Sequence, residues 1–346
     1  MQKSWKLSRR NLLRASLAAP ALWLPSRVIE PARAWTHGSA LSVPSPAAAV
    51  GFNRLAFFDD FLSASTIDLS NTGNAGFNWY VDFTNGLNYT NGDPFPPITA
   101  AACSVSNSIL SLQNTAGNDG FQGICSAKFN TNGTLKHGQV FTNGAFFQYS
   151  FRYDDTLAPG SAGATSWPAL ACNSYSGFVQ GIFPDTELDL FEAPPCGVNA
   201  LPACTGNNFA PTAETNKQFN FNYRTTNLNT INGGINVNGG PQTNGQNWNL
   251  MQTMGTLWVP MAQNSGTGYT RRFLVQGGSP NWVEIPNVFV QYTATGPATF
   301  PNGGNSINGT NSNGIYSSLD SQLNPLIIYG ALGWPILVDY VAVWTL

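Results

Sequence analysis

The chain has 346 residues, of which only 9% are charged, and its formal net charge at pH 7 is −2. Lysine and arginine supply most of the affinity of proteins for phosphate, so we do not expect a chain with this balance to bind nucleic acid. Its two histidines, His37 and His137, exclude a multi-histidine metal centre. A Ser-His-Asp triad would depend on His137 alone, in a glycine-rich turn.

Residues 1–34 have the features of a twin-arginine export signal. The pair Arg9-Arg10 precedes two leucines and a modest apolar stretch, and small residues at 32–34 provide a cleavage site. The apolar stretch is too short to span a bilayer, and no later segment is long and apolar enough. We therefore expect a periplasmic or secreted protein without a membrane span. After removal of the signal, 8 basic and 16 acidic residues give a net charge of −8.

Residues 35–50 are rich in alanine, serine and proline and are expected to form a flexible linker. Over residues 51–346, short β-type runs recur between Asn, Gly and Pro turns, without a sustained helical apolar period. This pattern predicts one all-β domain, a curved two-sheet β-sandwich of the jelly-roll type, with long Asn/Gly-rich loops at 229–249 and 301–314. The expected strands are 55–61, 109–113, 144–153, 187–191, 218–223, 257–260, 273–276, 288–293 and 336–344.

Five cysteines occur in the expected domain, and an exported protein can form disulfides. Their spacing suggests two pairs, Cys103 with Cys125 and Cys196 with Cys204. Cys172 would then stay buried and free. None of the five has the spacing of a metal or redox site.

The segment 187–192, Glu-Leu-Asp-Leu-Phe-Glu, places three carboxylates in one short apolar run. Its large apolar residues predict a β-strand, on which alternation puts Glu187 and Asp189 on one face. Glu192 lies an odd number of positions from Glu187, which would point it into the core. A β-bulge adds one residue, restores parity and returns Glu192 to the same face. The run therefore predicts a bulged strand with three acids on one side.

Three neighbouring acids are costly, because each ionised group raises the pKa of the others. Catalysis gives such a cluster a purpose, since glycoside hydrolysis uses one ionised carboxylate and one protonated carboxyl around the scissile bond. Two other uses of the run remain open. One is an exposed acidic strand, and the other is a calcium site built from hard oxygen ligands.

Tryptophans provide candidate sugar-binding surfaces, because aromatic rings stack on the apolar faces of sugars. Trp167 lies upstream of the acids, where a neighbouring strand would bring it to their face. Three others lie beside polar loop residues and are candidates to line a groove: Trp79, Trp248 and Trp282. The three in apolar runs are expected in the core: Trp258, Trp334 and Trp344.

The chain resembles glycoside hydrolase family 16, the laminarinase, lichenase, agarase and carrageenase group. Four landmarks in the same order carry the resemblance: Phe-Phe-Asp-Asp-Phe at 57–61, Trp-Pro-Ala at 167–169, the E-x-D-x-x-E pattern at 187–192, and Gly-Trp-Pro at 333–335 before the closing strand 337–344. Together they span nearly all of residues 52–346.

The resemblance implies a jelly roll with the acids on a concave substrate face. It implies that Glu187 is the nucleophile, Glu192 the general acid/base and Asp189 the residue that assists Glu187, with retention of configuration. Gln252 occupies a strand position where family members often carry histidine, and it is a candidate substrate-binding residue that cannot titrate. The usual Asp-Gly turn after the next strand appears as Gln276-Gly277.

From the residues and the resemblance together, we expect an exported endo-acting glycoside hydrolase whose substrate is a β-linked polysaccharide, with β-1,3-glucan as the expected polymer. This chemistry requires no cofactor, a structural calcium ion stays open, and a monomer is expected. Two alternatives remain. One is a lectin-like, carbohydrate-binding jelly roll whose acids hold calcium, and the other is a transglycosylase that uses the same acids.

Overall fold

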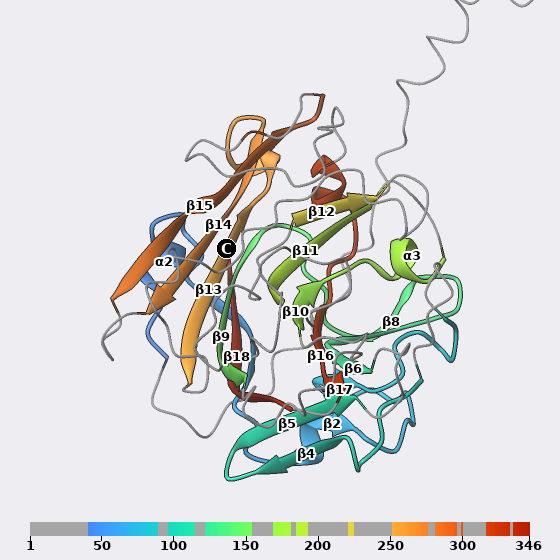
Figure 1. Ribbon diagram of the computed structural model, residues 1–346. Coiled ribbons are helices and arrows are strands. Elements are labelled where there is room, and N and C mark those ends of the chain that lie inside the picture. Colours follow the sequence, from blue (N-terminus) through green and yellow to red (C-terminus); the bar gives the residue numbers. More distant parts are fainter. Residues whose placement is uncertain are drawn as a thin grey trace, which may run out of the picture. The chain divides into compact units, whose positions relative to one another are not determined.

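Two β-sheets that face each other make up most of the described chain (Figure 1). The structure is a computed structural model that describes residues 41–88, 96–114, 122–153, 169–180, 185–192, 221–224, 251–275, 281–295, 299, 316–332 and 335–346. The segment Leu41–Leu346 forms one compact unit. The export signal and the two long Asn/Gly-rich loops lie outside the described residues, so they remain predictions.

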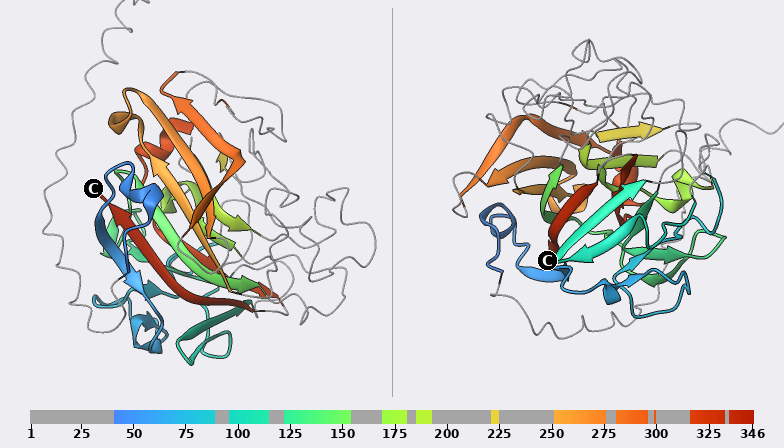
Figure 2. Two further views of the ribbon diagram at one scale, coloured as in Figure 1. Left: turned by 90° about the vertical axis from the view of Figure 1, so that its left-hand side faces the viewer. Right: turned by 60° about the horizontal axis from the view of Figure 1, so that its bottom comes forward.

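One sheet has nine strands in the order β15-β14-β13-β9-β18-β5-β17, with β1 paired to β18 and β4 paired to β5. The bounds of its strands are β1 (Arg54–Asp59), β4 (Cys103–Ser106), β5 (Ile109–Asn114), β9 (Ala145–Tyr153), β13 (Gln252–Val259), β14 (Thr267–Val275), β15 (Trp282–Thr293), β17 (Ala331–Leu332) and β18 (Ile336–Thr345). Its long strands lie side by side in both further views of the molecule (Figure 2).

The other sheet has seven strands in the order β12-β11-β10-β16-β6-β3-β2. Their bounds are β2 (Ile67–Asp68), β3 (Trp79–Tyr80), β6 (Gly123–Cys125), β10 (Ala169–Cys172), β11 (Asp185–Glu192), β12 (Phe221–Arg224) and β16 (Leu326–Tyr329). The strands β7 (Ala127–Phe129) and β8 (Leu135–Gly138) form a separate pair.

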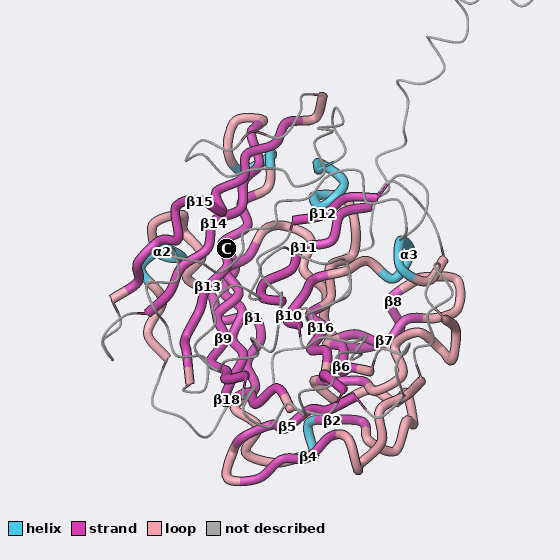
Figure 3. The backbone as a smooth tube through the Cα atoms, viewed as in Figure 1, coloured by secondary structure: helices cyan, strands magenta, loops and turns pink. Residues whose placement is uncertain are grey.

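Helices are few and short in the described part of the chain (Figure 3). They are the α-helices α2 (Ser45–Ala48) and α3 (Tyr175–Phe178) and the 3₁₀ helices η1 (Ala64–Thr66), η6 (Met261–Gln263) and η7 (Tyr316–Asp320). No helix in the described ranges has the length and apolar character needed to cross a membrane. The prediction of an all-β, two-sheet sandwich is confirmed.

The main hydrophobic core lies between the two sheets, and strand alternation decides which side chains enter it. In β9, Phe147, Tyr149 and Phe151 belong to this core, whereas Phe146 belongs to a second cluster on the outer face of the nine-stranded sheet. The seven-stranded sheet contributes Leu170 and other apolar residues to the same core and has a third cluster on its own outer face. Each sheet is therefore partly covered on both sides.

Residues 41–50, which the sequence places in a linker, contain helix α2. Ala47 of this helix is fully buried in the outer cluster of the nine-stranded sheet, together with Phe52 and Phe146. The buried side chain is an alanine, a residue that is also common in linkers, so the composition of the segment alone does not reveal this packing.

The sequence makes Trp79 a groove candidate, and that prediction is wrong. Its side chain is 0% exposed and contacts the rings of Phe57 and Phe61 at centroid distances of 5.3 and 6.0 Å. Its Nε1 donates to Oδ2 of Asp59 at 2.9 Å. This buried partner satisfies the indole N–H, so the tryptophan can serve as core filler. Trp258 and Trp344 are buried as expected.

The predicted disulfide between Cys103 and Cys125 is also wrong, because both thiols are free and buried. Cys103 belongs to the core between the sheets, while Cys125 belongs to the cluster on the outer face of the seven-stranded sheet. The sheet itself therefore separates the two sulfur atoms. Cys172 is free and buried, as predicted. Cys196 and Cys204 lie outside the described residues.

Candidate active site

The acidic strand β11 contains the bulge that the sequence requires. Leu170 of β10 is opposite Phe191, but the next residue of β10, Ala171, is opposite Asp189. The register therefore skips Leu190, which is the additional residue of β11. Ala169 is opposite Glu192 on one side of the bulge.

The bulge places the three acids on one face of the sheet by register. Asp189 and Glu192 are opposite Ala171 and Ala169, and both alanines belong to the outer cluster of the seven-stranded sheet. Glu187 precedes Asp189 by two positions and shares its face. The prediction of a bulged strand is therefore confirmed at the level of the backbone. The side chain of Glu192 lies outside the described part of the structure.

The apolar residues of β11 face the opposite way. Leu188, Leu190 and Phe191 are all buried in the core between the sheets. The bulge accounts for two adjacent core residues, Leu190 and Phe191, because it interrupts strict alternation at this point. The acids are thus attached to the hydrophobic core through the same strand.

Asn173 contacts Glu187 directly. It follows β10, is 1% exposed, and its Nδ2 donates to Oε1 of Glu187 at 3.2 Å and to the hydroxyl of Tyr329 at 3.1 Å. A hydrogen-bond donor favours the charged form of a carboxylate and limits its rotation. Sequence reasoning missed both Asn173 and Tyr329. The only signal for Asn173 is its place just after the strand that pairs with the acids.

Asp189 lies between the other two acids and is buried, with 2% of its surface exposed. On β10, Ala171 lies opposite Asp189 and Ala169 lies opposite Glu192, so the residues that face these two acids are small. Burial disfavours the charged form of a carboxyl group, and so does a neighbouring negative charge. Asp189 is therefore placed to influence the neighbouring Glu187. Glu187 itself is only partly buried.

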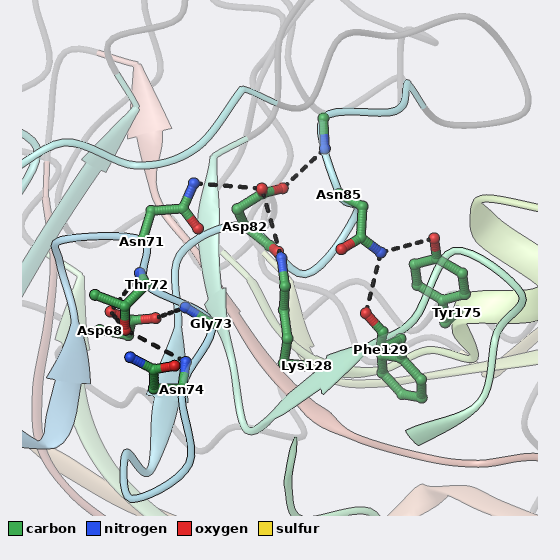
Figure 4. Close-up of polar contacts among 11 residues, drawn as sticks. Asp68, Asn71, Thr72, Gly73, Asn74, Asp82, Asn85, Lys128, Phe129 and Tyr175 are labelled. Atoms are coloured by element: carbon green, nitrogen blue, oxygen red, sulfur yellow. Dashed lines mark hydrogen bonds and ion pairs between the residues drawn. The ribbon is translucent and has the colours of Figure 1, made fainter. Parts of the chain in front are cut away.

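A polar network fixes a loop on the same side of the seven-stranded sheet (Figure 4). Asp82 accepts a hydrogen bond from the backbone N–H of Gly86 at 2.9 Å and forms an ion pair with Lys128 at 3.5 Å. Asn85 then donates from Nδ2 to the carbonyl of Phe129 and to the hydroxyl of Tyr175, each at 3.1 Å.

The rings of Phe129 and Tyr175 stack with centroids 5.0 Å apart. Both belong to the cluster that contains Ala169 and Ala171, the residues opposite the acids. The network therefore anchors a wall of loop 81–88, β7 and α3 beside the acid face. The polar side chains of this wall are hydrogen-bonded, which lowers the free-energy cost of burying them.

Only two of the four predicted substrate-binding residues, Gln252 and Trp282, lie in the described part of the chain. Trp167 and Trp248 lie outside the described residues. Gln252 begins β13 opposite Phe151, and alternation gives it the side of the nine-stranded sheet that faces the core. Trp282 packs on the outer face of that sheet, where its ring meets Phe146 edge-on with centroids 5.3 Å apart. Neither residue shares the face of the acids.

Among the described side chains, no three of His, Cys, Asp or Glu are arranged to hold a metal ion. His137 lies in β8 and is partly exposed. By backbone register, β11 places Glu187, Asp189 and Glu192 on one face, and carboxyl groups are residue types that acid–base and nucleophilic chemistry uses.

No protein-family model and no curated protein matches the chain. Several solved structures do match. One is an endo-acting O-glycanase expressed by members of the human gut microbiota, with TM-score 0.39 and 13% identity, covering 85% of this chain and 100% of that one. Another is Humicola insolens endocellulase EGI, with TM-score 0.35 and 12% identity, covering 70% and 76%.

A third similar structure is the exoplasmic/lumenal domain of VIP36 in its form bound to Ca²⁺ and Man3GlcNAc. Its TM-score is 0.34 and its identity 9%, and the match covers 71% of this chain and 81% of that one. All three scores are low, so the function proposed below rests on the residues of this chain.

Proposed function

We propose that the protein is a retaining endo-glycoside hydrolase that cleaves a β-linked polysaccharide with Glu187 and Glu192. The observation that carries the proposal is the bulge at Leu190, because it gives Glu187, Asp189 and Glu192 a common face. A strand without that bulge would point Glu192 into the core. A bulge next to an active site is a recurrent device for redirecting a side chain.

In the proposed reaction, the carboxylate of Glu187 attacks the anomeric carbon while Glu192 gives its proton to the departing glycosidic oxygen. The glycosidic C–O bond breaks and an ester forms between the sugar and Glu187. Glu192, now ionised, takes a proton from water, whose oxygen attacks the anomeric carbon and releases Glu187. Two displacements at one carbon give overall retention.

Asn173 supports the role of Glu187 as the nucleophile. Its hydrogen bond to Oε1 favours the ionised carboxylate that attack requires. Asp189 assists from its buried position two residues further along β11. This division of roles follows the resemblance to glycoside hydrolase family 16.

The same resemblance makes β-1,3-glucan the proposed polymer. The first landmark, at 57–61, lies in and just after β1, and the closing strand 337–344 that follows the last landmark lies in β18, which pairs with β1. The first landmark and the closing strand are thus neighbours in the nine-stranded sheet. They support membership of the family without determining the linkage.

The test is hydrolysis of laminarin, mixed-linkage glucan, agarose and carrageenan by the wild type and by Glu187→Gln. We expect cleavage of laminarin by the wild type and a loss of activity on the order of 10⁴-fold in the variant, as for the removal of a catalytic group. Glu284→Gln is the matched control, since Glu284 pairs with Arg271 in the nine-stranded sheet. Unchanged activity in Glu187→Gln contradicts the proposal.

The same experiment separates the alternatives. A lectin-like protein would bind one of the four polymers without releasing reducing ends, and both variants would bind as the wild type does. A transglycosylase would lose its activity in Glu187→Gln but would give longer as well as shorter products. Cleavage of a polymer other than laminarin would keep the mechanism and change the substrate.

A further inference from the structure

Two buried donors from the nine-stranded sheet reach across the core to the bulge of β11. The hydroxyl of Tyr149, in β9, donates to the carbonyl oxygen of Leu190 at 2.8 Å. Nη2 of Arg272, in β14, donates to the carbonyl oxygen of Asp189 at 2.9 Å. The two acceptors are consecutive carbonyls, and they belong to the bulged residue and to the acid before it.

A bulge leaves backbone groups without their regular partners in the ladder. The carbonyls of Asp189 and Leu190 lie at this bulge. Buried carbonyls need hydrogen-bond donors, and these two receive them from side chains of the opposite sheet.

Burying the charged guanidinium of Arg272 costs free energy. Its side chain is 1% exposed, and burial lowers the pKa of its guanidinium to about 10, against the favourable charges of nearby groups. The titratable groups whose charges act on it are Tyr149 of β9, Asp189 of β11 and Cys172 of β10, and each of them raises its pKa. Burial of a guanidinium is offset only where its N–H groups find acceptors, and the carbonyl of Asp189 is one such acceptor.

We propose that Arg272 and Tyr149 are positioning residues that clamp the β11 bulge and so hold Glu187 and Glu192 on one face. This inference rests on the proposed hydrolase function. Arg272 holds the carbonyl just before the bulged residue, and Tyr149 holds the carbonyl of the bulged residue itself. Thr256 of β13 supports the clamp, since its Oγ1 lies 3.1 Å from the Tyr149 hydroxyl.

The inference is tested with Arg272→Met, which keeps much of the side-chain length and removes the donors. Arg271→Met is the matched control: it changes the same residue type one position earlier in β14, where the side chain faces away from the core and pairs with Glu284 at 2.7 Å. We expect Arg272→Met to lower kcat on the order of 100-fold with little change in KM, because misplaced reacting groups slow the chemical step. Arg271→Met should keep both constants.

Amide hydrogen exchange provides a readout that does not need activity. Peptides that contain 185–192 should exchange faster in Arg272→Met than in the wild type, while peptides that contain β18 keep their protection. If the wild type cleaves no polysaccharide, the proposed function fails, and the exchange pattern still decides whether the clamp exists. An active wild type with unchanged kcat and unchanged exchange in Arg272→Met overturns the clamp and leaves the hydrolase intact.

Tyr149→Phe is the second variant, in case Arg272→Met does not fold. It removes one hydroxyl and keeps the ring that contacts Phe151 at a centroid distance of 5.7 Å. A fall in kcat at constant KM, with faster exchange of 185–192, supports the clamp. A fall in thermal stability alone, with kcat and exchange of 185–192 unchanged, shows an ordinary structural role and overturns it.

Discussion

Asn173 and Glu187 are joined by a hydrogen bond of 3.2 Å, from the amide Nδ2 to the carboxylate Oε1. The same amide donates to Tyr329 of β16, so one side chain connects the end of β10 with two neighbouring strands of the sheet. Asn173 is buried, and its backbone is fixed between β10 and the Ser174 cap of α3. The carboxylate of Glu187 is therefore held by a rigid partner.

Asn173→Ala should lower kcat by about 10- to 100-fold, because a hydrogen bond to a charged group contributes about 1.5–3 kcal/mol. The acidic limb of the pH–rate profile should move to higher pH, since the ionised carboxylate loses a donor. The measurement is kcat across the acidic pH range. Asn264→Ala is a suitable control, as Asn264 is exposed and its amide donates only locally to Thr267. A profile with an unmoved acidic limb contradicts the role of Asn173.

The raised pKa of Asp59 leads us to expect a specific pH dependence of the stability of the protein. Burial raises its pKa, although the Asn78 side chain, the Phe61 backbone N–H and the Trp79 indole all donate to it and oppose the rise. A proton then binds the folded state more tightly than the unfolded state. The stability gained from protonation is fully present below the ordinary pKa of 3.8 and is lost as pH rises through the raised value.

Asp59→Asn should be less stable than the wild type by about 1–3 kcal/mol at pH 7. The NH₂ group of the new amide cannot accept the hydrogen bonds that Asn78, Phe61 and Trp79 donate to the carboxylate. The deficit should widen as pH is lowered toward the raised pKa, because only the wild type gains a proton there. Urea unfolding at pH 7 and at progressively lower pH measures the difference. A deficit that shrinks on acidification would have the wrong sign.

The three described cysteines should be inert thiols in the native protein. Burial raises the pKa of Cys103 to about 12 and raises the pKa of Cys125 and Cys172 as well. The reactive thiolate is therefore scarce, and access is blocked. Alkylation followed by peptide mapping should label none of the three in the native state and all three in denaturant. A peptide that links Cys103 to Cys125 in a non-reducing digest would contradict the structure.

We propose that residues 1–34 direct export through the twin-arginine route. Arg9→Lys combined with Arg10→Lys should retain the full-length precursor in the cytoplasm of a bacterium that has this pathway. Arg27→Lys combined with Arg33→Lys is the matched control, because it changes the same number of arginines within the signal but outside the pair. Cell fractionation measures the outcome, and export of the doubly substituted pair would refute the proposal.

Residue alternation made β9 and β18 predictable, whereas β13, β14 and β15 were predicted only in part, as the runs 257–260, 273–276 and 288–293. The runs 144–153 and 336–344 correspond to β9 and β18, whose side chains fill the main core. Short strands such as β3 and β6 were not predicted, since two or three residues give too few positions to show a period. The wrong disulfide has the same origin. The sheet face of Cys125 cannot be read from a strand of three residues.

The candidate site also has a part that the sequence predicts and a part that it does not. The bulge was predictable because Glu187 and Glu192 have odd spacing on a strand whose other face must be apolar. The groups that hold the bulge were not, because Tyr149 and Arg272 lie 41 and 83 positions away from the carbonyls they bind. A tyrosine and an arginine within long strands carry no local sign of such a partner. Tyr149 and Arg272 reach β11 only because the two sheets pack face to face in the folded protein.

The stereochemistry of the first product tests the central claim most directly, since a covalent intermediate on Glu187 requires two displacements at the anomeric carbon and therefore gives retention. Proton NMR during early hydrolysis of laminarin, or of whichever of the four polymers is cleaved, records the anomer before mutarotation. We expect the β-anomer to appear first from a β-linked polymer, and Glu187→Gln to give no product. Initial release of the α-anomer by the wild type would contradict it.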